Sequence, residues 1–420
     1  MPSGLPSNLR WLFIDMNSFF ASAEQHDEAA YRGRPLAVVP VDSDSTCFIA
    51  ASYEAKKLGV GMGMPVWEAK RRFPELIIVK ARPARYMELH RAILEASDKH
   101  AACTKVYSID EWGIRLAPAE QSPEAAMHLA RRIKGQIAAD LSPFLRCSAG
   151  IAPTRMLAKI ACDLRKPDGL TVLTTADLPA RLNHLEPQDL PGISQGMAER
   201  LRRHGVTSVA GMWDLTRVQA RQVWGSVMGE HWWYGFHGVD VPEVRTRTST
   251  MGHSNVLEPR FRNEDGAHGI LVRLLCKLGM RLRHHGFFAN HLRAWVRHEC
   301  GRVWVDEIAL PCLQDTPSLL KQFEKMWQRR QRMLHHLVRT TGIGPPKKIA
   351  VDVLRLVKAV DVPEPLFEEL NRPLRLSRVM DEVNQKSGKH LLYFASMHNY
   401  RHDMDDKIAF GRLPDEAIRM

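Results

Sequence analysis

Three carboxylates in this sequence have the types and positions that metal-dependent chemistry requires. Asp15 closes an apolar, β-branched run at residues 11–16, and the pair Asp110-Glu111 lies inside a second such run at residues 106–116. Adjacent strands that end in carboxylates can bring those side chains to one edge of a sheet. Such an edge can hold two magnesium ions for phosphoryl or nucleotidyl transfer. Because carboxylates placed so closely repel one another, the arrangement implies bound cations.

The Asp-Glu pair is ambiguous by itself, since the chain contains four others. These are Asp27-Glu28, Asp306-Glu307, Asp381-Glu382 and Asp415-Glu416. The pair at 306–307 also lies in a strand-like run. Taken alone, each pair is expected to be an exposed surface feature, because charged residues are rarely buried. The residues near Asp15 and Asp110 therefore decide which pair does chemistry.

Two aromatic residues, Phe19 and Phe20, follow Asp15 at the start of a helical pattern. In one interpretation both are core residues. In the other, one ring forms the wall beneath a bound sugar.

Two further segments could contact phosphates. Ser52-Tyr53 begins a helical pattern that carries Lys56 and Lys57 one turn later, so hydroxyl and ammonium donors could join the positive end of the helix. Lys166 lies in a basic turn at residues 164–169. The alternatives are solvated lysines in the first segment and an ordinary turn in the second.

A third kind of signal lies at residues 189–201, where Gly192, Ile193 and Gly196 follow Leu190-Pro191. An apolar-Pro-Gly-apolar turn between short helices exposes backbone N–H groups to a nucleic-acid phosphate, as in a helix-hairpin-helix. Phosphate contacts of this kind position a nucleic acid without reading its sequence. The alternative is a plain packing corner between two helices.

Length and charge indicate a multidomain protein with a polyanionic partner. The 420 residues favour two to four domains. Apolar residues make up 45% and charged residues 25%, and the formal net charge is +12 with a pI near 9.5. Residues 242–357 contain 20 Lys and Arg against 10 Asp and Glu, so 20 − 10 = +10 lies in this quarter. A basic module of this kind favours nucleic acid over a small acidic metabolite.

Cysteine usage and hydropathy point to the cytoplasm. The seven cysteines are scattered without a CxxC spacing, which indicates reduced thiols rather than a disulfide frame or a zinc site. The histidine-rich positions 284–285 and 298–300 match no common metal spacing. No 18-residue apolar span and no basic-then-apolar leader is visible, so no membrane association is expected.

The elements that must position these residues alternate along the first part of the chain. Residues 1 to about 175 read as an α/β or α+β sheet domain. Strands are predicted at 11–16, 36–41, 46–51, 105–110, 112–116, 146–151 and 170–174. Helices are predicted at 18–25, 53–58, 84–100 and 123–140, with another from about Thr154. Residues 176–238 are predicted to be all helical. Residues 245–357 are predicted to contain both strands and helices, with a long helix at 266–285. Prolines at 363, 365 and 373 suggest a linker into a tail.

Taken in order, these signals resemble the Y-family translesion DNA polymerases, the DinB/UmuC group, from Trp11 to about Val357. The resemblance implies that Asp15, Asp110 and Glu111 are the catalytic metal ligands, with the Met16 carbonyl contributing, and that Phe20 is the steric gate beside Phe19. It further implies nucleotide contacts from Tyr53, Lys56 and Lys166, and a roof over the nascent base pair that includes Cys47 and Ile49. Asn17 replaces an aspartate of many DinB-type members, and Ala50 replaces a phosphate-contacting hydroxyl of some relatives.

The implied fold is a multidomain α+β right hand. The palm, a mixed sheet with helices, takes residues 1–18 and 84–175, and small fingers take 19–83. A helical thumb with the helix-hairpin-helix takes 176–241. A DNA-binding little-finger α/β domain follows at 242–357, with Arg245 and Arg247 at its start. Residues 358–420 form a linker and a UmuC-like tail.

The implied activity is template-directed addition of dNTPs to a primer 3′ end, specialised for error-prone synthesis across damaged DNA in the SOS response. The implied cofactor is Mg²⁺, as two ions that Mn²⁺ can replace. The implied partners are primer-template DNA, dNTPs, a sliding clamp, and an accessory mutagenesis subunit or recombinase filament. Leu366-Phe367 matches only the end of the clamp-binding peptide of relatives. The alternatives are a catalytically silent scaffold that binds DNA and clamp, and a nucleotidyl cyclase.

Overall fold

The computed structural model describes residues 8–242, 247–341, 344–363, 367–387 and 391–400. The chain divides into two units that meet in sequence between Val244 and Arg245. None of the helices in the described ranges is long and apolar enough to cross a membrane.

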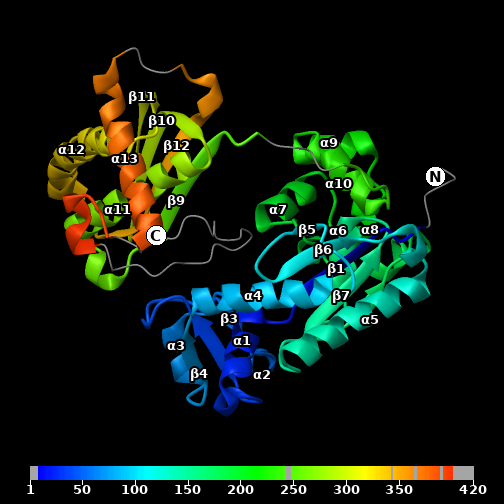
Figure 1. The fold of residues 1–420 in the computed structure, drawn as a ribbon. Coiled ribbons are helices and arrows are strands. Elements are labelled where there is room, and N and C mark those ends of the chain that lie inside the picture. The colour runs from blue at the N-terminus through cyan, green and yellow to red at the C-terminus, as the bar shows by residue number, and fades with distance from the viewer. Residues whose placement is uncertain (1–7, 243–246, 342–343, 364–366, 388–390, 401–420) are drawn as a thin grey trace. The chain divides into compact units, whose positions relative to one another are not determined.

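The main sheet of the first unit has β1 at its centre and the strand order β5-β6-β1-β7-β8 (Figure 1). β1 pairs antiparallel with β6 and β7, and β7 pairs parallel with β8. The strands are β1 Trp11–Met16, β5 Lys105–Val106, β6 Glu111–Arg115, β7 Cys147–Ala152 and β8 Leu170–Val172. The predicted strands are therefore present, although the predicted run 105–110 is paired only at its first two residues.

The alternation of β1 sends its side chains to two separate cores. Leu12, Ile14 and Met16 belong to the core that also contains residues of α1, α4 and α5. Phe13 belongs to the core built around α6. Asp15, one pleat further on, shares the α6 side of the sheet with Phe13. The helices are α1 Phe19–Asp27, α4 Pro83–Asp98, α5 Pro123–Asp140 and α6 Arg155–Asp163.

A glycine brings α6 unusually close to this sheet. Gly150 of β7 is paired with Phe13, and a Cβ atom on Gly150 would lie 2.0 Å from the Ala158 carbonyl oxygen of α6. Only glycine permits this approach. Thr154 caps α6, its side chain accepting a hydrogen bond from the Leu157 N–H. The sheet and α6 are therefore packed backbone to backbone beside Asp15.

A smaller three-stranded sheet, in the order β3-β2-β4, lies in the segment predicted as fingers. Its elements are β2 Leu36–Val39, β3 Ala50–Ala51, β4 Ile77–Lys80, α2 Tyr53–Lys57 and α3 Val66–Arg72. The predicted strand at 46–51 is much shorter in the structure. β4 and α3 had no counterpart among the predictions, although β4 contains the apolar run Ile77-Ile78-Val79 and α3 buries Val66 and Ala69.

The rest of the first unit is helical, as the sequence predicted. Its α-helices are α7 Gln195–Arg203, α8 Val209–Trp213, α9 Arg217–Trp224 and α10 Met228–Phe236. The turn before α7 follows only a single 3₁₀ turn, Pro187–Asp189, rather than an α-helix.

The second unit is an antiparallel sheet in the order β11-β10-β12-β9, packed against α11 and α12. Its strands are β9 Thr250–Val256, β10 Phe287–His298, β11 Val303–Leu313 and β12 Pro346–Lys358, and its two long helices are α11 Glu264–His284 and α12 Thr316–Thr341. The predicted long helix corresponds to α11, whereas α12 was not predicted.

The segment predicted as a linker and tail contains a helix, α13 Glu368–Ser387, with Pro373 inside it, followed by a 3₁₀ helix, Ala395–Tyr400. α13 is fastened to α11 by a bidentate ion pair from Arg283 to Asp381, at 2.6 and 2.8 Å. The reading of Pro373 as a linker residue is therefore wrong. This part of the tail completes the second unit.

Candidate active site

Asp15 and Glu111 face each other across the main sheet. They are direct partners in the antiparallel register of β1 and β6. Asp15 is almost fully buried, and Glu111 is half-buried. The sequence separates these residues widely, and the β1–β6 pairing brings them together.

Asp110 adjoins this pair at the start of β6. Its carbonyl oxygen accepts a hydrogen bond from the Met16 N–H at 2.9 Å, which ties it to the end of β1. Its carboxylate accepts a 2.5 Å hydrogen bond from the Ser108 hydroxyl. The two strands thus place Asp15, Asp110, Glu111 and the Met16 backbone at one sheet edge, as the sequence predicted.

Lys159 of α6 joins the facing carboxylates. Its Nζ atom lies 2.5 Å from Asp15 Oδ2, 2.8 Å from Glu111 Oε1 and 3.3 Å from Asp163 Oδ1. Lys166 approaches the same edge, 2.8 Å from both Asp15 Oδ2 and Asp163 Oδ1. The close packing of α6 on Gly150 makes the short reach of Lys159 possible.

Burial and these lysines shift the carboxyl pKa values in opposite directions. Burial acts to raise the pKa of Asp15, but Lys159 and Lys166 outweigh it, so the pKa is lowered. Burial raises the pKa of Asp110, and it raises the pKa of Glu111 to about 7 in spite of Lys159. The pKa of Lys159 is raised, because its three carboxylate neighbours outweigh its burial. Burial thus favours the protonated forms of Asp110 and Glu111, whereas the lysines favour the ionised form of Asp15.

The donor set fits a divalent cation of the hard type. Carboxylate and backbone carbonyl oxygens are the ligands that Mg²⁺ and Mn²⁺ take in proteins. Within the described residues, no group of three or more acidic, histidine or cysteine side chains has converged into a ready metal cluster. The contacts describe the arrangement instead: Lys159 bridges Asp15 and Glu111, and the Ser108 hydroxyl holds Asp110.

A cationic group lies beside the carboxylates. Lys56 Nζ donates to Ser18 Oγ at 2.7 Å and lies 4.4 Å from the centre of the Tyr53 ring. Charges on Lys166 and Asp15 influence the Tyr53 hydroxyl, whose pKa is raised chiefly by burial. Ser18 is the N-cap of α1 but makes no side-chain cap hydrogen bond, and its hydroxyl instead accepts a hydrogen bond from the Lys56 ammonium at the positive end of α1. Lysines, phenol and helix end together favour an anionic ligand.

Asn17 anchors the turn that carries Lys166. Its side-chain oxygen accepts the Asp168 N–H at 2.7 Å, and its side-chain nitrogen donates to Ser148 Oγ at 3.0 Å. Lys134 Nζ donates to the Asp168 carbonyl oxygen at 2.6 Å. A Cβ atom on Gly169 would lie 1.7 Å from the Arg165 carbonyl oxygen, so the turn requires glycine. The departure at position 17 thus has a structural role that the sequence did not reveal.

Phe20 packs against Tyr86 of α4, with ring centres 4.6 Å apart and planes inclined by 14°. The Tyr86 hydroxyl donates to Glu24 Oε1 at 2.7 Å, and Arg82 holds Glu24 with three hydrogen bonds. Phe19 is buried nearby, its ring centre 5.9 Å from that of Phe20. The Phe20 ring therefore packs on a Tyr86 side chain that Glu24 holds in place.

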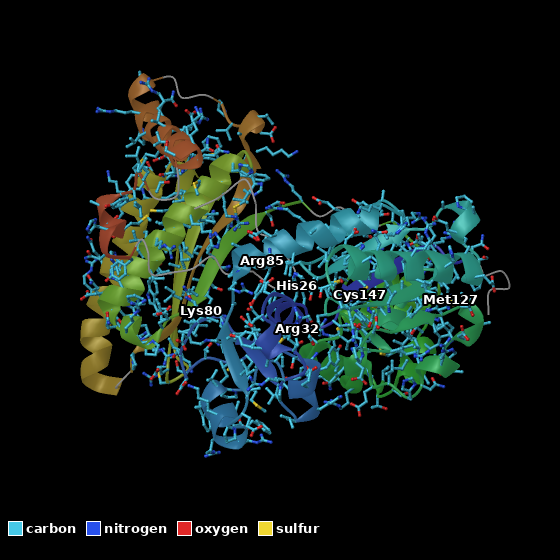
Figure 2. The ribbon with its side chains drawn as sticks, turned by 60° about the horizontal axis from the view of Figure 1, so that its bottom comes forward. His26, Arg32, Lys80, Arg85, Met127 and Cys147 are labelled. Carbon is cyan, nitrogen blue, oxygen red and sulfur yellow. The ribbon has the colours of Figure 1, made fainter. Side chains whose placement is uncertain are left out.

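Two arginines labelled in Figure 2 hold the last turn of α1. Arg85 pairs with Asp27, and Arg32 donates to the carbonyl oxygens of Gln25 and His26.

The other predicted site residues are spread more widely. Cys47 is exposed and forms an isolated bridge with Pro65, and Ile49 is half-buried against the core that lies between the main sheet, α1, α4 and α5. Gly192 has φ +90°, Ile193 is buried, and Gly196 is the second residue of α7.

For the remaining predicted contacts, Arg247 and Phe367 are exposed, whereas Arg245 and Leu366 lie outside the described residues.

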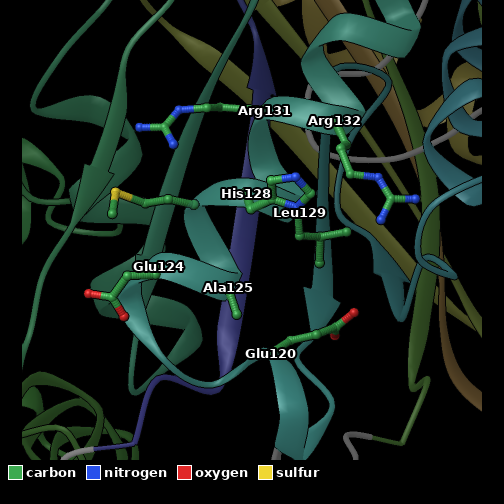
Figure 3. A pocket seen from close by; sticks show the side chains of 8 residues that line it. Glu120, Glu124, Ala125, His128, Leu129, Arg131 and Arg132 are labelled. Carbon is green, nitrogen blue, oxygen red and sulfur yellow. The ribbon is translucent and has the colours of Figure 1, made fainter.

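A separate surface hollow lies on α5, away from the carboxylates (Figure 3). Glu120, Glu124, His128, Arg131 and Arg132 line it, and the figure shows the two arginines pointing in different directions. This mixed, open surface presents no convergent group, and no chemistry is assigned to it.

The sequence analysis missed Lys159, Asp163, Tyr86 and Glu24 as site residues. Lys159, Asp163 and Lys166 follow one another at helical spacing after Thr154, which was a visible signal for a charged helix face. Tyr86 and Glu24 carried no such signal, because only the packing of α1 on α4 brings them together.

Known proteins are similar to this chain over most of its length. The model of the impB/mucB/samB family matches residues 14–163, and the model of its C-terminal domain matches 248–361. DNA polymerase IV 1 of Bacillus subtilis (strain 168) is 28% identical over 399 residues, covering 92% of this chain and 93% of that protein. DNA polymerase IV of Halorhodospira halophila is 31% identical over 290 residues, covering 68% and 80%.

Solved structures share the fold at lower sequence identity. A Y-family DNA polymerase chimera of Dbh and Dpo4 superposes with a TM-score of 0.66 at 23% identity, covering 83% of this chain and 99% of the chimera. An insertion ternary complex of Dbh DNA polymerase gives a TM-score of 0.51 with the same identity and coverage.

Proposed function

The chain belongs to the impB/mucB/samB family and is a Y-family translesion DNA polymerase, and on this premise we propose that Asp15, Asp110 and Glu111 carry its chemistry. The observation that supports this assignment most strongly is the pairing of Asp15 with Glu111 beside the cationic group of Tyr53, Lys56 and Lys166. Enzymes of this family depend on divalent metal, and we assign the metal as two Mg²⁺ ions, for which Mn²⁺ can substitute.

The three carboxylates and the Met16 carbonyl would hold these ions. When bound, the metal lowers the pKa of the primer 3′-hydroxyl and neutralises charge on the triphosphate and pyrophosphate. The residues themselves fix the reacting edge: β1 and β6 hold the carboxylates, and burial disfavours leaving them without a cation.

Lys56, Lys166, Tyr53 and the N-terminal end of α1 would bind the triphosphate of the incoming dNTP. Lys166 contacts Asp15, Lys56 contacts Ser18 at the start of α1, and the positive end of a helix favours phosphate. Phe20 would lie beneath the sugar and exclude a 2′-hydroxyl by contact. This steric filter requires the Phe20 ring to stay in place when the nucleotide binds, and stacking on Tyr86 restricts its movement. Cys47 and Ile49 would contribute to the roof over the base pair.

The second unit and the helical segment would hold primer-template DNA. The basic excess of residues 242–357 suits salt-sensitive backbone contacts, and the turn at Gly192–Ile193 offers N–H groups to a phosphate. The boundaries of palm, fingers, thumb and little finger stay as predicted from the sequence. We extend the proposal to a sliding clamp through Phe367, which is exposed immediately before α13.

The two alternatives predict different products. A silent scaffold extends no primer, and a nucleotidyl cyclase converts NTP alone into a cyclic product. The test is single-nucleotide incorporation by the full chain with Mg²⁺, on an undamaged template and on the same template with a lesion. Template-directed incorporation of dNTP on both supports the proposal. Absence of incorporation at every metal and salt concentration, or a cyclic product from NTP alone, overturns it.

A further inference from the structure

Lys159 has a position that the proposed reaction leaves unexplained. Its ammonium group contacts Asp15, Glu111 and Asp163, and its side chain is only 16% exposed. Lys166, Lys56 and the end of α1 already provide the charge that the proposed triphosphate site needs. Lys159 instead lies between the two carboxylates that the proposal assigns to metal.

Charge at this edge shows why a lysine there matters. Asp15, Asp110, Glu111 and Asp163 supply four carboxylates, and Lys159 and Lys166 supply two ammonium groups. Without Lys159, Asp15 and Glu111 would lose the ammonium group that they share. Burying charged carboxylates without such a partner is costly in a site of low dielectric. Lys159 therefore stabilises the arrangement of the carboxylates when metal is absent.

We propose that Lys159 is a built-in competitor of the metal, a positioning residue that holds Asp15 and Glu111 in their places and must leave them when a divalent cation binds. The inference rests on the proposed metal site. It assigns to Lys159 a role in setting metal affinity, distinct from the triphosphate contact assigned to Lys166.

Asp163 provides the place to which Lys159 can withdraw. The two residues lie four positions apart on α6, and Asp163 Oδ1 is 3.3 Å from Lys159 Nζ. Lys159 can thus leave Asp15 and Glu111 while remaining paired within its own helix. Because Asp163 also contacts Lys166 at 2.8 Å, both lysines share this carboxylate.

The test measures Mn²⁺ binding to the DNA-free full chain by calorimetry, so that activity is not the readout. Lys159→Met removes the charge, Lys159→Arg keeps it, and Lys99→Met is the control. Lys99 pairs with Asp140 at 2.8 Å on the surface of the same unit, far from the carboxylates in the sheet. Asp15→Asn shows whether the binding measured belongs to this edge.

We expect Lys159→Met to bind Mn²⁺ about tenfold more tightly than wild type, and to melt at a lower temperature without metal but gain more from its addition. Lys159→Arg should restore the weaker affinity, and Lys99→Met should leave it unchanged. An affinity that is unchanged or weaker in Lys159→Met overturns the inference, because a purely structural lysine lowers the melting temperature without tightening metal binding.

A second variant keeps the test decisive if Lys159→Met folds poorly. Asp163→Asn removes the withdrawal site and should weaken Mn²⁺ binding, and this effect should vanish in the Lys159→Gln background. An Asp163→Asn effect that persists in that background contradicts the inference. If Asp15→Asn leaves Mn²⁺ binding intact, the proposed metal site itself fails, which separates the two outcomes.

Discussion

The Phe20 ring stacks on the Tyr86 ring at 4.6 Å, and Tyr86 is in turn fixed by Glu24, one turn after Phe20 on α1. The aromatic wall proposed to contact the sugar therefore has a support from α4 that is anchored back to its own helix. This arrangement separates two contributions to sugar discrimination, the ring itself and its rigidity.

Phe20→Ala should raise ribonucleotide incorporation relative to dNTP incorporation by about 100-fold or more, because the filter is a single steric contact. Steady-state kinetics with matched dNTP and NTP give the ratio. Phe236→Leu, a buried phenylalanine of α10, is the control and should leave it unchanged. An unchanged ratio in Phe20→Ala contradicts the assignment.

Tyr86→Leu should also raise ribonucleotide incorporation, but less than Phe20→Ala, because it removes the backing and keeps the ring. Tyr86→Phe keeps the stack and should retain most of the discrimination. The same kinetic ratio is measured for both variants. Equal ratios for Tyr86→Leu and wild type would show that the Phe20 ring needs no support from α4.

Asn17→Ala should raise KM for dNTP about tenfold with a smaller effect on kcat. The substitution removes the hydrogen bonds from the Asn17 side chain to the Asp168 N–H and to Ser148, which hold the turn that carries Lys166. Asn17→Asp keeps the acceptor for the Asp168 N–H and should be closer to wild type. Lys166→Ala provides the reference. If Asn17→Ala changes kcat alone, the role assigned to the turn is wrong.

Metal binding by the DNA-free chain should strengthen with pH up to about 7 and then level off. Burial raises the pKa of Glu111 to about 7, so its carboxyl holds a proton below that pH and must release it to bind metal. The pKa of Asp15 is lowered, so Asp15 is already ionised over this range. Mn²⁺ titrations from pH 5.5 to 8.5 measure the profile. Glu111→Gln should flatten it, and a wild-type affinity independent of pH contradicts the prediction.

Asp381→Ala should destabilise the second unit by about 1–3 kcal/mol, since the Arg283 side chain, only 7% exposed, loses a bidentate partner. Urea unfolding followed by tryptophan fluorescence gives the change. Asp361→Ala, in the 3₁₀ helix after β12, is the control. A free energy of unfolding within error of wild type would show that α13 is not held by this pair.

The sequence predicted the parts of the site that lie at strand ends. Asp15, Asp110 and Glu111 follow from two β-branched runs, because a carboxylate that interrupts or closes such a run marks where the buried strand ends. The register that sets Asp15 opposite Glu111 could not be predicted, since it depends on pairing between distant segments. For the same reason the contact from Tyr86 to Phe20 was beyond sequence patterns.

Two missed elements carried visible signals. β4 contains the apolar, β-branched run Ile77-Ile78-Val79, and α12 has its buried apolar residues at helical spacing, as at Leu319, Phe323 and Met326. Pro373 suggested a linker, but it is the sixth residue of α13, where the helix accommodates it with the loss of one backbone hydrogen bond. Lys159 was visible as a helical residue, yet only the close approach of α6 to Gly150 shows that it reaches Asp15.

The central claim is that Asp110 and Glu111, rather than another Asp-Glu pair, perform nucleotidyl transfer. Primer extension by Asp110→Ala and Glu111→Ala tests it most directly, with Asp306→Ala and Glu307→Ala as controls from the other pair that lies in a strand, β11. We expect the first two variants to lose at least about 1,000-fold in rate while keeping primer-template affinity, and the controls to extend primers like wild type. Extension by Asp110→Ala and Glu111→Ala at the wild-type rate would contradict the account.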